Sequence, residues 1–125
     1  MATLREWILK TANGEFIEGV VIGRTGGNGS DEDYVLGDDL ADDYGSEAIP
    51  NYQEHPRGRV LSWEDAQPHL RYQFNSDHGS VRCEAIYAWT ASRVIFITQY
   101  DGATWPCWVP RNPNPTAVTP DMPGG

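Results

Sequence analysis

Hydrophobic and polar residues alternate most regularly between Val81 and Val109. Two short turn sequences, Ala91-Ser92 and Asp101-Gly102, interrupt this alternation, and Asp-Gly is one of the strongest short-range signals of a hairpin. The pattern therefore predicts three antiparallel strands in a meander. Pro106 lies in the third strand and cannot donate a ladder hydrogen bond, so we expect that strand at an edge of the sheet.

The two turns also fix the expected register, in which every second side chain points to the same face. The predicted pairs are Tyr87 with Phe96, Trp89 with Val94, Thr98 with Trp105, and Phe96 with Cys107. One face then carries most of the large side chains, and we expect it to form the core: Cys83, Ala85, Tyr87, Trp89, Val94, Phe96, Tyr100, Trp105, Cys107 and Val109. The other face is expected to be partly covered, with Trp108 as its exposed aromatic residue.

Upstream of the meander the pattern is less regular. Two runs rich in strand-forming residues flank Asn13-Gly14, which predicts an N-terminal hairpin over residues 4–23. Residues 62–70 are typical of a short helix capped by Ser62. Residues 70–75 are a candidate fourth strand of the meander.

These elements predict an α+β fold in one small domain dominated by antiparallel β-sheet. The domain should span residues 1–112, with an acidic insertion over about 25–56 and a proline-rich tail over 113–125. A chain of 125 residues is the ordinary size of one domain.

The distribution of charge along the chain says more about function than the overall composition does. The net charge is −9, yet residues 25–56 contain nine acidic and no basic residues, so the remainder is neutral. An acidic segment repels the phosphate backbone of nucleic acid and attracts a basic protein surface. We therefore predict a non-enzymatic protein that binds a basic partner, on the charge analogy of nucleic-acid mimics and inhibitors from phages or mobile elements. The partner-binding residues would be Asp31, Glu32, Asp33, Asp38, Asp39, Asp42, Asp43 and Glu47.

An alternative function rests on aromatic residues near the C-terminal hairpin. Trp108, Tyr100 and Trp105 could stack on a sugar or a nucleotide in a small-ligand binding β-module. A second alternative is a small metal-dependent enzyme. A homodimer formed through the edge strand also stays open.

The motifs of a metal centre or an enzyme are missing. Neither Asp31 nor Asp38 begins a loop with calcium-ligand spacing, which leaves only an irregular calcium site open in the acidic segment. The candidate zinc ligands follow no short repeat, so no metal or cofactor is predicted: His55, His69, His78, Cys83 and Cys107. The glycine-rich loop at 23–30 lacks the Lys-Ser/Thr pair of a phosphate loop.

Catalytic residues are equally hard to assign. Ser76, Asp77 and His78 are adjacent in sequence, whereas catalytic triads converge in space, so a turn explains them better. Glu84 and Glu64 could pair as acid and base, but any acidic protein offers such pairs. Whether the protein is an enzyme is left open, and no catalytic residue is predicted.

The two cysteines fall on strands separated by a third, too far apart for a disulfide. We expect free thiols. No apolar run has the length of a signal peptide or a membrane span, so the expected location is the cytoplasm.

Overall fold

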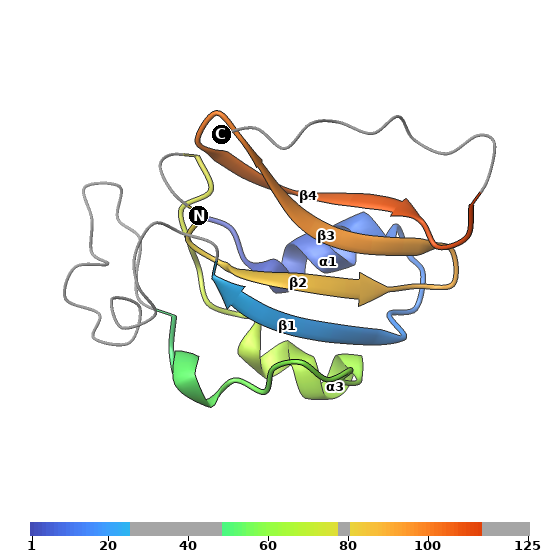
Figure 1. The fold of residues 1–125 in the computed structure, drawn as a ribbon, viewed down its shortest axis with the longest axis horizontal. Helices are drawn as coiled ribbons and strands as arrows, with labels where there is room; N and C mark the ends of the chain where they lie inside the picture. The colour runs from blue at the N-terminus through green and yellow to red at the C-terminus, as the bar shows by residue number, and fades with distance from the viewer. Residues whose placement is uncertain (26–48, 78–80, 114–125) are drawn as a thin grey trace.

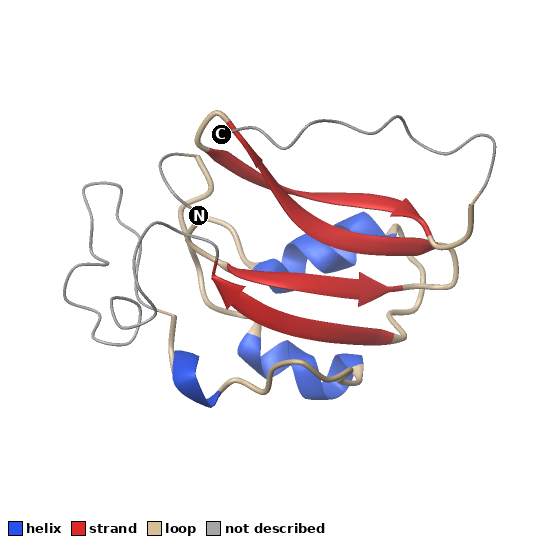
Figure 2. Cartoon of the chain, viewed as in Figure 1, coloured by secondary structure: helices blue, strands red, loops and turns tan. Residues whose placement is uncertain are grey.

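A four-stranded antiparallel sheet is the centre of the fold (Figure 1 and Figure 2). The computed structural model describes residues 1–25, 49–77 and 81–113. The strands lie in the order β1-β2-β3-β4, with the bounds Gly19–Thr25, Glu84–Trp89, Arg93–Tyr100 and Ala103–Pro110. The predicted α+β class, dominated by antiparallel sheet, is confirmed.

The N-terminal hairpin is wrong, because Leu4–Ala12 forms the helix α1. Leu4, Ile8 and Ala12 recur every fourth residue and are buried as one stripe, a spacing that suits a helix. The Thr3 side chain accepts a hydrogen bond from the backbone N–H of Glu6 and caps the helix start. Asn13 adopts a left-handed conformation with φ 53°, so the Asn-Gly pair ends a helix instead of turning a hairpin.

The short helix over residues 62–70 is confirmed. α3 (Trp63–Ala66) begins after Ser62, whose side chain accepts from the backbone N–H of Asp65, and the 3-10 turn η2 (Gln67–His69) continues it. A second 3-10 turn, η1, spans Tyr52–Glu54. Residues 70–75 form only an isolated bridge, between Ala2 and Phe74, so the strand predicted there is wrong and β1 is the fourth strand instead.

The predicted register of the meander is confirmed pair by pair. The structure pairs Tyr87 with Phe96, Trp89 with Val94, Thr98 with Trp105, and Phe96 with Cys107. Asp101 and Gly102 have φ of 50° and 81°, as a tight two-residue hairpin turn requires. β4, which contains Pro106, lies at an edge of the sheet as expected.

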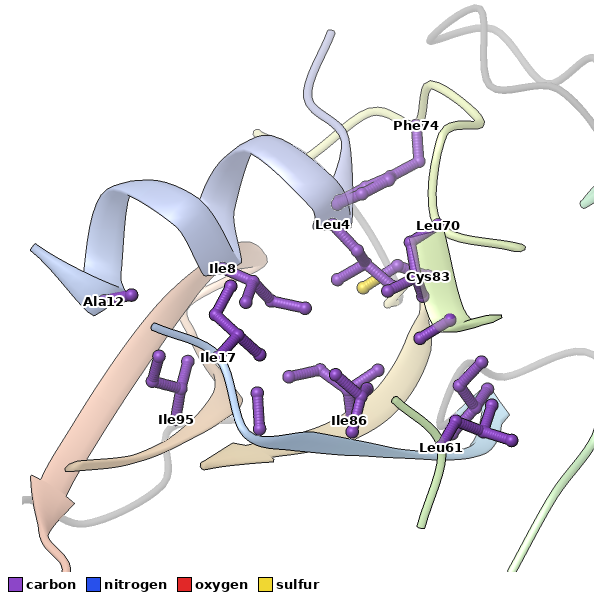
Figure 3. Close-up of a cluster of buried hydrophobic side chains, with 14 residues drawn as sticks. Leu4, Ile8, Ala12, Ile17, Leu61, Leu70, Phe74, Cys83, Ile86 and Ile95 are labelled. Carbon is purple, nitrogen blue, oxygen red and sulfur yellow. The ribbon is translucent and has the colours of Figure 1, made fainter. Parts of the chain in front are cut away.

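The core, however, is on the opposite face from the one predicted. The sheet buries Val20, Ile22, Ile86, Ala88 and Ile95 against α1 and the segment 61–74 (Figure 3). These aliphatic side chains are smaller than the aromatic ones on the other face and let a helix approach closely. This face was expected to be partly covered; α1 and the segment 61–74 instead bury it as the core.

Candidate functional site

The side of the sheet away from α1 has no described segment packed over its aromatic side chains, and we call it the outer face. It is defined by alternate positions on the four strands: Val21, Gly23, Ala85, Tyr87, Trp89, Val94, Phe96, Thr98, Tyr100, Ala103, Trp105, Cys107 and Val109. None of these side chains is charged. Tyr87 is 56% exposed, Tyr100 60% and Trp105 41%, which is unusual for aromatic residues in one patch.

Two of the three aromatic residues predicted to bind a ligand lie on this outer face. Tyr100 and Trp105 are exposed there, although the sequence suggested that they were core. Trp108, expected to be exposed, is instead half-buried on the opposite face and packs against the core. The guanidinium of Arg93 lies 4.0 Å above its ring. The aromatic residues of the outer face therefore include Tyr87 and Trp89, whose ring centres are 6.1 Å apart. They do not include Trp108.

A hollow of about 210 Å³ opens in the outer face between β1, β2 and β3. Gly23 and Ala85 belong to its lining together with Tyr87 and Phe96. A Cβ added to Gly23 would lie 3.4 Å from the Ala85 Cβ, so a larger residue at position 23 would press against Ala85 at the edge of the hollow. The hollow can accept one apolar side chain or one ring of a ligand.

On the other side of β2 lies a buried carboxylate, that of Glu84, at the start of the strand. Its side chain has no exposed surface, and it accepts hydrogen bonds from His55 Nδ1 at 2.9 Å and from the Tyr72 hydroxyl at 3.2 Å. The Arg57 guanidinium also donates to it. A buried carboxylate needs such partners, because desolvation of an unpaired charge is costly. The Glu84 cluster, defined as Glu84, His55, Arg57 and Tyr72, is therefore fully paired.

The Glu84 cluster fastens the chain on both sides of the undescribed residues 26–48. Arg57 donates to the carbonyl oxygens of Gly23 and Tyr52, and its guanidinium lies 4.3 Å above the Tyr52 ring. The backbone N–H of Thr25 donates to the Tyr52 hydroxyl at 3.1 Å. The end of β1 and the turn η1 are thereby held together at the base of the acidic insertion.

Beside the Glu84 cluster is a pocket of about 310 Å³ with two histidines in its lining. The ring centres of His55 and His69 are 4.8 Å apart. Because a carboxylate only accepts, His55 Nδ1 carries the proton shared with Glu84, and Nε2 is the nitrogen left for other partners. Burial, and then the neighbouring His55, lowers the pKa of His69, while burial raises the pKa of Tyr72.

Sequence reasoning missed the Glu84 cluster, although one signal was present. Glu84 has the same strand parity as Ile86 and Ala88, which marks it as inward-facing, and a lone inward carboxylate requires partners. The partners themselves come from an irregular segment after the insertion, which no periodicity locates. Glu64, its predicted acid–base mate, is exposed on α3.

The remaining predicted residues divide into two groups. All eight acidic residues of the predicted partner-binding segment, from Asp31 to Glu47, lie outside the described residues, as does His78. Cys83 and Cys107 are free thiols, as expected, and Cys83 is fully buried. Among the described residues there is no group of three or more His, Cys, Asp or Glu side chains placed to hold a metal ion.

No helix in the described ranges is long and apolar enough to cross a membrane. Comparison of the chain with protein-family models, with curated proteins and with solved structures gave no match.

Proposed function

We propose that this is a non-enzymatic binding protein, and that the outer face of its sheet is the centre of an interface with another protein. The observation that carries the proposal is that five aromatic rings share an uncharged sheet face and three of them are at least 41% exposed: Tyr87, Trp89, Phe96, Tyr100 and Trp105. Tyrosine and tryptophan dominate the binding energy of protein interfaces. An uncharged centre with charges around it is also the usual anatomy of such an interface.

The size of the outer face fits this role. An eight-residue strand such as β3 extends about 26 Å, and four strands at their usual spacing span about 19 Å. Because β1 and β2 have only seven and six residues, the flat outline of the sheet is about 450 Å², and protruding side chains add to it. A stable interface buries roughly 800 Å² on each partner, so the outer face supplies most of one.

Charge indicates what kind of partner fits. The described residues carry nine basic and nine acidic side chains, so the net charge of −9 belongs to the rest of the chain. A partner with an apolar patch flanked by basic residues would be attracted by the acidic segment and held by the outer face. Imitation of a nucleic acid, as an inhibitor of phage or mobile-element type, is one form that this proposal includes. We further propose that it acts in the cytoplasm, which the two free thiols support.

A second candidate function follows from the hollow around Gly23 and Ala85. Its volume of about 210 Å³ and its apolar walls, Tyr87 and Phe96, suit one uncharged ring, such as that of a neutral sugar. A nucleotide fits less well, because no basic side chain of the outer face would meet its phosphate. Gly23→Val would fill the hollow, so loss of sugar binding with partner binding unchanged would favour this candidate.

The proposal is tested by capture from a lysate of the source organism with three immobilised baits. They are the unchanged protein, a Tyr87→Ser/Trp105→Ser variant, and a Phe16→Ser variant as the matched control. Phe16 is 78% exposed and lies outside the sheet, so its change removes an exposed aromatic residue elsewhere. A partner of the proposed kind is recovered by the first and third baits and lost from the second.

The acidic segment is tested with a fourth bait, in which Asp38, Asp39, Asp42 and Asp43 are changed to Asn. Weaker recovery of the same partner, and weaker recovery at higher salt, support attraction to a basic surface. If no protein depends on Tyr87 and Trp105, the proposed interface is wrong. If light scattering instead shows a dimer abolished by the Tyr87/Trp105 changes, the outer face binds a second copy and not a basic partner.

A further inference from the structure

The pocket beside the Glu84 cluster carries an inference independent of the outer face. We propose that His55 and His69 together bind a divalent transition-metal ion of the zinc, nickel or copper class, with solvent at the remaining coordination positions. Imidazole nitrogen is a preferred ligand of these ions.

The first argument is the tautomer of His55. Its Nδ1 lies 2.9 and 3.0 Å from the two oxygens of Glu84, so Nδ1 is the protonated nitrogen and Nε2 presents its lone pair elsewhere. Metal-binding histidines nearly always donate their second ring N–H to such a carboxylate or to a carbonyl. Glu84 therefore holds His55 as a metal ligand is ordinarily held.

The second argument is the spacing of the two rings. A metal–nitrogen bond of about 2.0–2.1 Å, added to the distance from nitrogen to ring centre, places two imidazole centres about 5 Å apart around a tetrahedral ion. The centres of His55 and His69 are 4.8 Å apart, with the rings tilted by 55°. Both rings line the same pocket, whose volume of about 310 Å³ has room for an ion and its waters.

The rest of the lining limits how tightly the ion is held. Arg57 neutralises Glu84, the exposed Arg71 adds a positive charge at the pocket, and the described lining of the pocket contains no carboxylate. Two protein ligands agree with the finding that no described group of three is placed for a metal. We expect binding of moderate strength, with a Kd of the order of 10–100 µM.

The test is titration of the chelator-treated full-length protein with Zn²⁺ and with Ni²⁺ by calorimetry. His69→Ala should weaken binding at least about tenfold, while His78→Ala, the matched control, should leave it unchanged. His69 is only half-buried, so its variant is expected to fold, and circular dichroism checks this. Glu84→Gln should weaken binding by about 10–100-fold, provided that the variant is folded at the temperature used.

A second readout does not depend on any variant. Substoichiometric Cu²⁺ should broaden the NMR signals of residues lining the pocket, Asn51, His69 and Arg71, before others. The inference is overturned if no ion binds more tightly than about 1 mM, if His78→Ala removes binding, or if neutralising the four aspartates from 38 to 43 removes it. Binding of inorganic phosphate at the pocket without metal binding would also overturn it and would assign the pocket to an anion through Arg71.

Discussion

His55 Nδ1 lies 2.9 Å and 3.0 Å from the two carboxylate oxygens of Glu84, in a place where neither side chain is exposed by more than 4%. Arg57 and Tyr72 donate to the same carboxylate. This single buried charge therefore joins the start of β2 to the irregular chain that follows the acidic insertion. Removal of the charge should therefore destabilise both the start of β2 and the chain segment that follows the insertion.

Glu84→Gln should lower the free energy of unfolding by about 3 kcal/mol, because it breaks a fully buried charge and leaves the half-buried Arg57 without its countercharge. Chemical denaturation at neutral pH measures the loss. Glu64→Gln is the matched control, since Glu64 is exposed on α3 and should change stability by less than about 0.5 kcal/mol. Equal, small losses of stability from the two changes would show that the buried Glu84 carboxylate does not stabilise the fold as argued.

The position of the core is tested by two changes on adjacent strands. Ile95→Ala removes a fully buried side chain that faces α1 and should cost about 2–5 kcal/mol. Trp105→Ala removes a larger side chain that is 41% exposed on the outer face, and it should cost less than Ile95→Ala. Thermal unfolding measures the stability loss of each variant. A larger loss from Trp105→Ala than from Ile95→Ala would indicate that the aromatic face is the core.

The strand register can be predicted from the sequence, whereas the buried face of the sheet cannot. The register of β2, β3 and β4 was predictable, because turn sequences and alternation of period two constrain each other. Which face is buried depends on what packs against it. The covering helix α1 was mistaken for a strand, since Asn13-Gly14 serves equally as a hairpin turn and as a helix end.

The candidate sites show the same division. Tyr100 and Trp105 are close in sequence, so their position on one face follows from the predicted pairing of β3 with β4, whereas their exposure does not. The Glu84 cluster and the His55–His69 pair join residues 12 to 29 positions apart through irregular chain, and no local pattern predicts such meetings.

The two thiols should differ in reactivity. Burial, and then the negative charge of Glu84, raises the pKa of the Cys83 thiol, so it does not form the reactive thiolate. Cys107 is half-buried on the outer face. In the native protein iodoacetamide should label Cys107 first, and Cys83 should react only on unfolding, as mass spectrometry of timed samples would show. Labelling of Cys83 at the rate of Cys107 would contradict the buried position of the former.

The pH dependence of the histidine pocket has a definite sign. Burial lowers the pKa of His69 below its ordinary value of 6.5, so the folded protein resists protonation of this ring. The resulting stability is present above pH 6.5 and is lost as pH falls through the folded pKa. In chelator-treated protein the imidazole NMR signal of His69 should titrate below that of a histidine in the unfolded chain. A midpoint above 6.5 would contradict the described environment.

The central claim, that the outer face is a protein interface, is tested most directly by the dissociation constant of a partner identified by the captures described above. For a purified partner, Tyr87→Ser/Trp105→Ser should weaken binding at least about 30-fold, the effect of losing about 2 kcal/mol at an interface hot spot. Phe16→Ser should leave the constant unchanged within about twofold, since a rim or remote residue contributes little. Equal constants for the two variants would contradict the claim.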